Sequence, residues 1–388
     1  MKHILFLLSR FLDGGIDRVL LDYLRNLSQR NDYRITLSIS TGMGALEVFL
    51  REVPQSVEVV HLVEDGWLTH WRKQKVVGQL PMAAKICDEL FLAPIRRSMI
   101  SRKLKSMTRN YDVVVDFDCC HYSFLKNVKT WKVGWWHFSF ENRMKIDHQR
   151  MRHIGKRLTV YDRVVVISKA MLEEGRRLFP QMEGRWRLIY NAKDQKHLQQ
   201  LAAEPVSDER INQPYILAVE RLEESQKDIA NLIRAFKLLK SQYQHEERLY
   251  ILGQGRSEDD LRQLAADLGL GDEVVFLGFR QNPYPWIRQT RLLVHSAKSE
   301  GLPTVLVEGI MLDKIIVATD CPTGPNEILN GGEAGVLVPV GNPQALAEGM
   351  HSALSDDDLR NRLLERLRTH RWHFTFETTQ RLFFQAVN

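Results

Sequence analysis

The amino-acid sequence predicts an α/β protein built from two doubly wound domains in tandem. Short apolar runs alternate with segments of helical periodicity over most of the 388 residues, the pattern of βαβ units and a parallel sheet. The alternation is lost once, in the polar segment 191–214. At about 100–200 residues a domain, the chain accommodates one domain on either side of this linker. Ligands then belong at the carboxyl ends of the strands, in the cleft between the domains.

Strands are expected wherever a short apolar run is bounded by turn residues. Before the linker they cover residues 3–9, 34–40, 57–62, 112–117, 132–137 and 163–168. After the linker they cover residues 215–219, 248–252, 273–277, 292–295, 315–319 and 335–338. The clearest helices between them cover residues 81–109, 228–240, 259–268, 304–311 and 344–354.

The composition is that of a soluble globular protein, with 44% hydrophobic and 26% charged residues. No apolar run approaches the ~20 residues that a membrane-spanning helix needs. The N-terminal run Ile4–Leu8 is short and is followed at once by Arg10 and Asp13, so we expect a buried strand rather than a signal peptide. The four cysteines lack metal or redox spacing, which is typical of a reducing cytosol.

Charge is divided unevenly along the chain. Residues 1–196 carry a net charge of +13 and residues 197–388 carry −7, within the total of +6. The basic clusters of the first half lie at 72–75, 96–105 and 143–157. Interleaved with them are the apolar residues Trp67, Leu68, Trp71, Leu80, Met82, Leu90, Phe91 and Leu92.

Basic helices with Trp and Leu on one face are typical of proteins that rest on anionic membrane surfaces. Plain solvated helix faces remain the alternative. The sequence contains no recognition helix, zinc spacing or aromatic RNA-binding motif, so we expect no nucleic-acid partner.

The segment 299–308 indicates a sugar–nucleotide site. Gly301 lets the backbone turn sharply, and Pro303 suits the first position of a helix. The unpaired N–H groups around Thr304 and the positive end of the helix dipole then suit a phosphate. Gly301, Pro303 and Thr304 are therefore candidate donor-binding residues.

Two carboxylates flank this helix start. Glu300 lies before the helix, at its mouth, and Glu308 lies roughly 8 Å along the axis from Pro303, at ~1.5 Å per residue. Because the residues around Glu308 are apolar, its carboxylate needs a partner, and a ligand hydroxyl is a good candidate. A carboxylate accepts two hydroxyl donors at once, which suits a ribose or a hexose. A surface loop residue and a solvated helix position are the alternatives.

Cations and glycines follow the first strand of each domain. Arg221 and Lys227 lie at a strand–loop–helix junction and could hold a diphosphate from two sides. Gly14 and Gly15 precede a helix and let backbone N–H groups approach an anion. An ordinary surface pair and a tight turn are the respective alternatives.

Three further turns follow strands of the second half. Gly253 lies in a Gly-Gln-Gly turn, and Arg280 lies in a turn that could run beside a nucleobase. Residues 323–327 supply another helix start facing the same cleft. Each of these is also compatible with ordinary turn chemistry.

His137 ends a strand, and we expect it to point into the cleft. Asp116 and Asp118 have the spacing of a metal-binding pair, but no further carboxylate or His is spaced to complete an octahedral site. Arg221 and Lys227 could neutralise a diphosphate instead. We therefore expect neither a metal nor another cofactor.

In order and spacing, these motifs resemble the retaining glycosyltransferases of family 4, which have the GT-B fold. The resemblance is most specific over residues 187–345. The residues that carry it are Gly14-Gly15, Val165–Ser168, Ile189–Asn191, Ala218–Arg221, Lys227, Gly253–Gly255, Glu300, Glu308 and Gly324–Glu327.

The resemblance implies two Rossmann-like domains around a central cleft, at 1–195 and 196–371, with residues 372–388 packing back onto the first. It implies transfer of a hexose or N-acetylhexosamine, with retention and without a metal, from a nucleotide sugar that we expect to carry UDP. The acceptor would be a lipid-borne saccharide, such as lipopolysaccharide or a polyprenyl-linked glycan. The protein would then work on the cytoplasmic face of the inner membrane.

By motif, Arg221 and Lys227 resemble the diphosphate-binding cations of the family, and Glu308 its ribose-binding carboxylate. Glu300 and His137 resemble the residues beside the donor sugar, and Gly15 resembles the glycine at the phosphate. The chain departs from the family at Glu220, where Gly is usual. That carboxylate could pair with Arg221 or hinder a phosphate.

Two alternatives of other classes stay open. A nucleotide-sugar 2-epimerase has the same fold and would convert the donor without an acceptor. A non-catalytic nucleotide-sugar-binding module would bind the nucleotide without turnover, and Glu220 is the residue that favours it.

Overall fold

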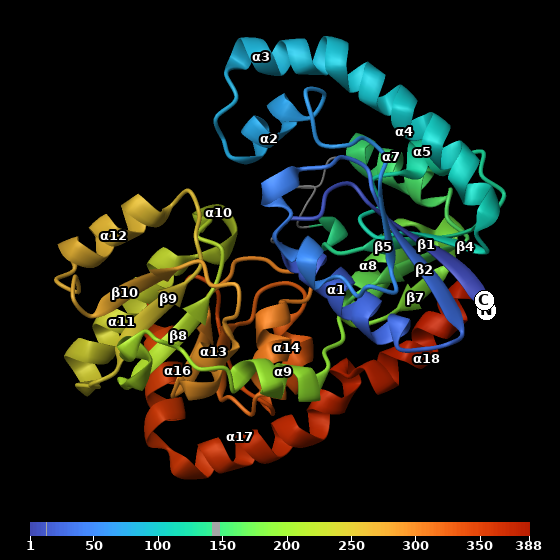
Figure 1. Ribbon diagram of the computed structural model, residues 1–388. Coiled ribbons are helices and arrows are strands. Elements are labelled where there is room, and N and C mark those ends of the chain that lie inside the picture. The colour runs from blue at the N-terminus through green and yellow to red at the C-terminus, as the bar shows by residue number, and fades with distance from the viewer. Residues whose placement is uncertain (13, 142–147) are drawn as a thin grey trace.

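The computed structural model describes residues 1–12, 14–141 and 148–388 and contains two fully parallel sheets (Figure 1). The strand order is β3-β2-β1-β4-β5-β6-β7 in the first sheet and β10-β9-β8-β11-β12-β13 in the second. In each sheet the order reverses beside the first strand, between β1 and β4 and between β8 and β11. Such a switch point opens a crevice at the carboxyl ends of the strands, where doubly wound sheets bind ligands.

The strands are short and mostly buried on both faces, as in other parallel sheets. Those of the first sheet are β1 (Lys2–Leu8), β2 (Tyr33–Ile39), β3 (Glu58–His61), β4 (Val113–Asp116), β5 (Trp131–Trp136), β6 (Arg163–Val166) and β7 (Trp186–Leu188). Those of the second are β8 (Tyr215–Val219), β9 (Arg248–Leu252), β10 (Val274–Gly278), β11 (Leu292–His295), β12 (Ile316–Thr319) and β13 (Val336–Val338). We call each sheet with its helices the first lobe and the second lobe.

Helices join the strands. Those that begin before β8 are α1 (Gly15–Ser28), α2 (His70–Val76), α3 (Met82–Cys87), α4 (Ala93–Met107), α5 (Tyr122–Leu125), α7 (His148–Leu158), α8 (Lys169–Leu178) and α9 (Gln195–Ala202). The later ones are α10 (Glu224–Lys227), α11 (Ile229–Tyr243), α12 (Glu258–Asp267), α13 (Tyr284–Gln289), α14 (Thr304–Met311), α15 (Pro325–Ile328), α16 (Pro343–Ser355), α17 (Asp357–His370) and α18 (Phe376–Val387).

The predicted doubly wound architecture is confirmed, and α14 has the predicted bounds. Three expectations were wrong, and two of them concern elements that were missed. The strand β7 was missed because its three residues carry too short an apolar pattern to be recognised. The segment 191–214 is not purely a linker, because it contains the helix α9, which packs against α13 and α14. This helix was missed because it buries only Leu198 and Ala202.

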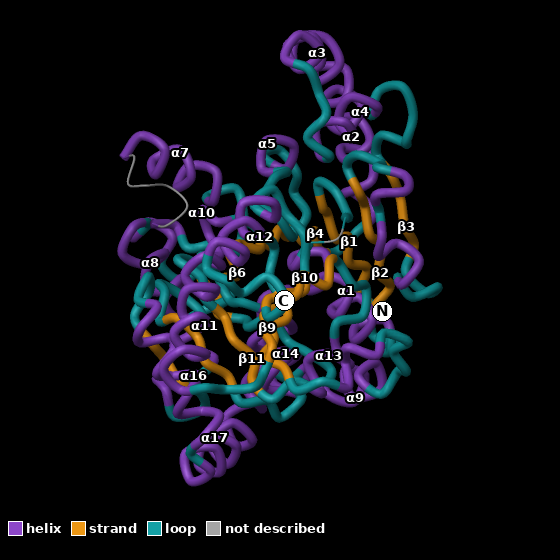
Figure 2. The backbone as a smooth tube through the Cα atoms, turned by 90° about the vertical axis from the view of Figure 1, so that its left-hand side faces the viewer, coloured by secondary structure: helices purple, strands orange, loops and turns teal. Residues whose placement is uncertain are grey.

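The helix expected over 81–109 is not one regular α-helix. It consists of α3, one π-turn at Asp88–Leu92, and α4. Pro94 lies at the start of α4 and has no N–H to donate to the preceding turn, which accounts for the interruption. In both views, α2 to α4 project beyond the first sheet (Figures 1 and 2), and we call residues 67–107 the helical arm. The basic cluster 143–157 lies partly outside the described residues.

The last helix, α18, returns to the first lobe after the chain has completed the second (Figure 1). Phe383 is fully buried there and stacks on Phe6 of β1, with 6.2 Å between the ring centroids. The indole N–H of Trp131 donates to the carbonyl of Ala386 at 3.1 Å. The chain therefore passes between the lobes twice, before α9 and again before α18. Within the described residues, no helix has the length and apolar character to cross a membrane.

Replacing Phe383 by Ala should lower the free energy of unfolding by about 3–5 kcal/mol, because it leaves a cavity among the rings of Phe6, Tyr23 and Trp135. Urea denaturation measures the loss. Arg381→Ala, an exposed change on the same helix, is the control and should change the stability by less than about 0.5 kcal/mol. Equal effects of both changes would contradict the docking of α18.

Candidate active site

The carboxyl ends of β8 and β11 hold a buried ion pair. Lys227, at the end of α10, and Glu300, in the loop after β11, lie with Nζ and Oε1 2.5 Å apart, and their side chains are 12% and 9% exposed. Burial alone would raise the pKa of Glu300, but the charge of Lys227 and contacts with His295 lower it to about 2. Burial likewise opposes the charged form of Lys227, and Glu300 and Glu220 raise its pKa. Both groups are therefore ionised at neutral pH.

His295, the last residue of β11, extends this pair into a row of four charges. Its Nδ1 lies 3.0 Å from Glu220 Oε1, and its Nε2 lies 3.4 Å from Glu300 Oε1. Burial would lower the pKa of His295, but the charge of Glu220 and the contacts with both carboxylates raise it to about 9. The imidazolium thus joins the two carboxylates behind the cleft.

One of the two possibilities for Glu220, pairing with Arg221, is wrong, because no contact between the two side chains is found within the described residues. Glu220 is buried, accepts the backbone N–H of Ser296 at 3.2 Å, and faces His295. A Glu is compatible with this position because His295, on the neighbouring strand β11, provides the matching charge.

The two predicted clamp residues differ in their surroundings. Arg221 is exposed, and its guanidinium donates to the side chain of Gln226 at 3.2 Å. Lys227 is instead buried against Glu300. The predicted diphosphate clamp is therefore not a pair of free cations, because one of the two shares its charge with the carboxylate at the mouth of α14.

The start of α14 lies against the first lobe. Pro303 precedes the helix as its N-cap, with Thr304 in the first helical position, so Pro303 lies one position earlier than predicted. A Cβ on Gly301 would lie 2.3 Å from the carbonyl oxygen of His137, at the end of β5. Only glycine allows the two lobes to approach so closely at this point.

His137 is buried rather than free in the cleft. Its Nε2 lies 2.7 Å from the carbonyl oxygen of Phe117, and its ring lies against the rings of Phe117 and Trp135. Burial lowers the pKa of His137 to about 4, which outweighs the opposing effect of the Phe117 carbonyl. The imidazole is therefore neutral at pH 7, with the Nε2 proton donated to Phe117 and Nδ1 left as an acceptor.

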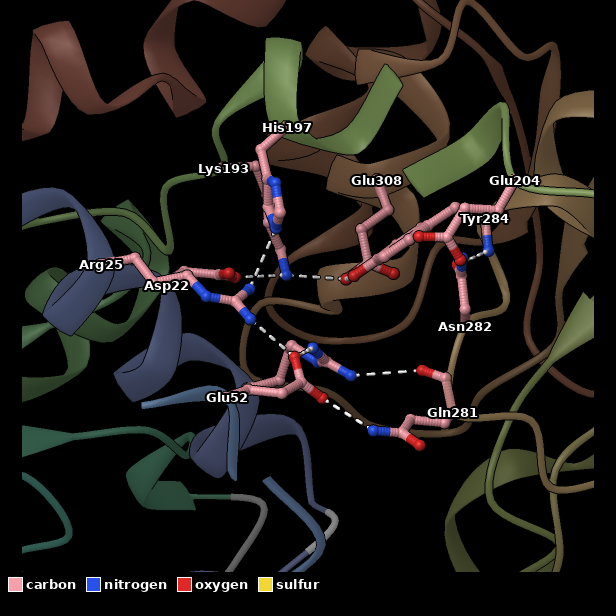
Figure 3. Close-up of polar contacts among 11 residues, drawn as sticks. Asp22, Arg25, Glu52, Lys193, His197, Glu204, Gln281, Asn282, Tyr284 and Glu308 are labelled. Carbon is pink, nitrogen blue, oxygen red and sulfur yellow. Dashed lines mark hydrogen bonds and ion pairs between the residues drawn. The ribbon is translucent and has the colours of Figure 1, made fainter. Parts of the chain in front are cut away.

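Glu308 does have a partner, but the partner belongs to the protein. The ammonium group of Lys193 lies 2.7 Å from Glu308 Oε1, and the hydroxyl of Tyr284 donates to the same oxygen at 3.4 Å (Figure 3). Lys193 also lies 2.8 Å from Asp22 of α1. Lys193 could not be recognised from the sequence, because it is 115 positions from Glu308 along the chain and belongs to no motif.

The predicted glycines have different settings. Gly14 is the N-cap of α1 and donates its N–H to the carboxylate of Asp17 at 2.9 Å, while Gly15 begins the helix with open space around it. Gly253 has φ of +145°, and a Cβ there would lie 1.9 Å from the carbonyl oxygen of Glu220. Close packing of the turns after β8 and β9 therefore accounts for Gly253 without a ligand.

Arg280 is not part of the Glu300 cluster. It is exposed and pairs with Asp208 at 3.4 Å, beside a surface hollow of about 420 Å³ next to α13. The neighbouring residue Gln281 contacts the first lobe instead, since its carbonyl accepts from Arg18 at 3.2 Å and its side chain donates to Glu52 at 3.0 Å. These contacts fix the turn beside the cleft.

Glu327 joins the lobes at a second point. Both of its oxygens accept the backbone N–H of Lys169, the first residue of α8, at 2.9 and 2.8 Å, and the hydroxyl of Tyr190 donates to it as well. The helix start at 323–327 was expected to face the ligand cleft. The structure instead uses its carboxylate to cap a helix of the opposite lobe.

The Asp116–Asp118 pair is joined by a residue that the spacing argument overlooked, His121. The three side chains could reach one cation, but each already has protein partners. Asp116 contacts His121 Nδ1 at 2.8 Å and accepts from the hydroxyl of Tyr161 at 2.5 Å, while His121 Nε2 lies 2.6 Å from the hydroxyl of Ser40. The cluster therefore serves to tie together the loops after β2 and β4.

Comparisons with known proteins agree with this architecture. Residues 202–370 match the family model described as glycosyl transferases group 1. An N-acetylgalactosamine-N,N'-diacetylbacillosaminyl-diphospho-undecaprenol 4-alpha-N-acetylgalactosaminyltransferase of Campylobacter jejuni is 32% identical over 54% of this chain and 55% of its own length. The lipopolysaccharide core biosynthesis glycosyltransferase LpsE of Rhizobium meliloti is 31% identical over 39% of this chain and 43% of its own length. The chain thus spans about half the length of the curated relatives it matches.

Solved structures match over nearly the whole chain. Anabaena Alr3699/HepE, solved in complex with UDP and glucose, has a TM-score of 0.74 at 18% identity and covers 99% of both chains. Sucrose-phosphate synthase from Thermosynechococcus elongatus has a TM-score of 0.76 at 17% identity over 99% of this chain and 98% of its own. The chain has the GT-B fold. Residues 202–370, which match the family model, also hold most of the candidate cluster.

The row of buried charges predicts a pH dependence of stability. The pKa of His295 is raised from 6.5 to about 9, so its contribution is complete below about pH 6.5 and is lost as the pH rises through 9. The pKa of Glu300 is lowered from 4.5 to about 2, so its contribution is present above about pH 4.5 and is lost towards pH 2.

His295→Gln should therefore flatten the fall in unfolding free energy between pH 6.5 and 9. It should change the acidic limb less, because Lys227 still faces Glu300. Urea denaturation at each pH measures both limbs. An alkaline fall of unchanged size in the variant would show that the imidazolium is not responsible for it.

Proposed function

We propose that the protein is a retaining glycosyltransferase of the family 4 type. It transfers a hexose or N-acetylhexosamine from a nucleotide sugar, with UDP as the expected nucleotide, to a lipid-borne saccharide. The observation that carries this proposal is the arrangement at the start of α14, where Glu300 and Lys227 form a buried ion pair at the switch point of the second sheet. The names of the relatives that act on undecaprenol-linked and lipopolysaccharide glycans support the class of acceptor.

Each charged group has a role in this proposal. Departure of the nucleoside diphosphate develops negative charge, which Arg221, Lys227 and the N-terminus of α14 stabilise because they are positive before the reaction begins. Glu300 remains ionised, so it accepts hydroxyl protons of the donor sugar in hydrogen bonds. Gly15 at the start of α1 lies against the phosphates from the opposite side.

The transfer itself needs no protein nucleophile. The acceptor hydroxyl attacks the anomeric carbon on the face that the phosphate leaves, so one C–O bond forms as the other breaks. The proton of the hydroxyl passes to the departing phosphate oxygen. In this scheme the neutral imidazole of His137 lies beside the sugar, and its Nδ1 accepts a hydrogen bond without adding charge. Arg221 and Lys227 perform the role that a metal has in other transferases.

In this proposal the two lobes bind different substrates. Residues 1–195 would receive the acceptor, residues 196–371 the donor, and residues 372–388 belong with the first lobe, as the packing of α18 on β1 supports. The close contact of Gly301 with His137 supports a cleft that excludes water from the donor when the lobes are together. Because Glu220 is paired with His295, it gives no reason to assign the chain a purely binding role.

Arg221→Ala and Lys227→Ala should each lower the rate of sugar transfer about 100-fold or more, because each removes a charge that faces the leaving group. Arg256→Ala, an exposed arginine that pairs with Glu223, is the control and should leave the rate within about threefold. Radiolabelled transfer from UDP-sugars to membrane lipid extracts measures the rates. Near-normal transfer in both variants would remove this mechanism, and conversion of the donor without an acceptor would identify an epimerase.

The helical arm supports peripheral membrane binding on the cytoplasmic face of the inner membrane, as a separate part of the proposal. Its exposed apolar side chains include Trp67 at 72% and Phe91 at 66% exposure. Buried Arg96 forms a two-pronged ion pair with Asp88 at 2.7 and 2.8 Å, which fixes the π-turn that carries Phe91. Apolar side chains among basic residues suit insertion between anionic headgroups.

The double change Trp67→Ala and Phe91→Ala should reduce co-sedimentation with vesicles of phosphatidylglycerol and phosphatidylethanolamine about tenfold at low salt. Trp372→Ala, an exposed tryptophan outside the arm, should have no effect. If the unaltered protein does not co-sediment with these vesicles, the membrane proposal fails while the transferase proposal stands.

A further inference from the structure

Lys193 is a buried lysine held between two carboxylates from opposite lobes. Its side chain is 1% exposed, and Nζ lies 2.8 Å from Asp22 Oδ2 of α1 and 2.7 Å from Glu308 Oε1 of α14 (Figure 3). Burial alone would lower the pKa of Lys193, but the charges of Asp22 and Glu308 outweigh it and raise the pKa. The ammonium group is therefore charged, as a lysine between two anions should be.

The backbone of Lys193 is fixed where the chain passes between the lobes. Its N–H donates to the carbonyl of Phe374 at 2.8 Å, and Lys193 pairs with Thr375 in an isolated parallel bridge. The first passage of the chain between the lobes thus lies beside the second at this residue. The position of Nζ is set by both lobes together.

Glu308 uses one carboxylate oxygen for these protein contacts. Oε1 faces Lys193 and accepts from the hydroxyl of Tyr284, whereas no hydrogen bond to Oε2 is found within the described residues. The side chain of Glu308 is 8% exposed, and Oε2 is not among the described oxygens that are fully buried without a partner, so it is accessible from the cleft. A ligand that brings hydroxyl groups to Oε2 satisfies this acceptor.

Lys193 also determines whether Glu308 keeps its orientation. The carboxylate oxygens of Asp22 and Glu308 both lie within 2.8 Å of the same nitrogen. Without the ammonium group between them, two like charges would face each other at short range. Glu308 would then turn away from Asp22, and Oε2 would lose its position.

We infer that Lys193 is a positioning residue for nucleotide recognition, which holds Glu308 so that Oε2 accepts the ribose hydroxyls, with Asp22 of the first lobe as its anchor. This inference rests on the proposed function, in which the nucleotide lies beside α14. It adds that the first lobe takes part in recognition of the ribose through the chain Asp22–Lys193–Glu308. Lys193 touches no substrate itself.

A second set of contacts between the lobes provides the matched control. Glu52 accepts from Arg18 at 3.1 Å and from Arg25 at 2.7 Å, and Gln281 of the second lobe donates to it (Figure 3). This set joins the same two lobes but does not touch Glu308. Glu52→Gln therefore weakens the contact between the lobes without affecting the ribose carboxylate directly.

The test compares binding of UDP and 2′,3′-dideoxy-UDP by calorimetry, with the full chain and its variants. The unaltered protein should prefer UDP about tenfold or more, as expected when a carboxylate loses its hydroxyl partners. Glu308→Gln and Lys193→Met should both reduce the preference to within about threefold, mainly through weaker UDP binding. Lys193→Arg should keep part of the preference, and Glu52→Gln should keep all of it.

The outcomes separate the inference from the proposed function. If Glu308→Gln loses the preference and Lys193→Met keeps it, Lys193 is not a positioning residue and the proposed function stands. If Lys193→Met weakens both ligands equally, its role is only structural and the inference is overturned. If the unaltered protein does not bind UDP, the proposed donor is wrong and the inference falls with it. Should Lys193→Met fail to fold, Asp22→Asn, which keeps the lysine, must lower the preference for the inference to survive.

Discussion

A buried carboxylate is tolerated only when a donor or cation lies against it, and this constraint organises the whole cleft. Glu300 lies against Lys227, Glu308 lies against Lys193, and Glu327 receives the N–H at the start of α8. Each partner comes from a different element. The requirement for charge pairing therefore determines how the loops after the strands are folded, and through them how the lobes meet.

Two of these pairings cross between the lobes and one does not. The Glu300–Lys227 pair belongs to the second lobe alone, so this contact does not depend on the first lobe. Glu308 and Glu327 instead find their partners in or beside the first lobe. The sequence pattern that resembles family 4 is carried mostly by the second lobe. The partners contributed by the first lobe follow no shared pattern, since Asp22 and Lys169 lie in ordinary helices.

The fold and the position of the site could be predicted from local patterns. Apolar runs predicted the strands other than β7 to within a residue or two, and the Gly-x-Pro turn predicted the start of α14, because both signals depend on neighbouring residues. The partners of the carboxylates could not be predicted in this way. Lys193 is 171 positions from Asp22, and His295 is 75 positions from Glu220, so only the folded sheets bring them together. A helix over 81–109 was predicted, but the π-turn that interrupts it depends on Pro94, whose effect hydrophobic periodicity does not report.

The double passage of the chain between the lobes has a mechanical consequence. The two backbone segments lie side by side and are joined where Lys193 pairs with Thr375. If one lobe rotates against the other, we expect the axis to lie near this junction. Atoms close to it would then move less than atoms farther away. The nucleoside of a bound nucleotide sugar, beside Glu308, would therefore move little during such a rotation. The sugar of the same molecule would be enclosed only once the lobes have come together.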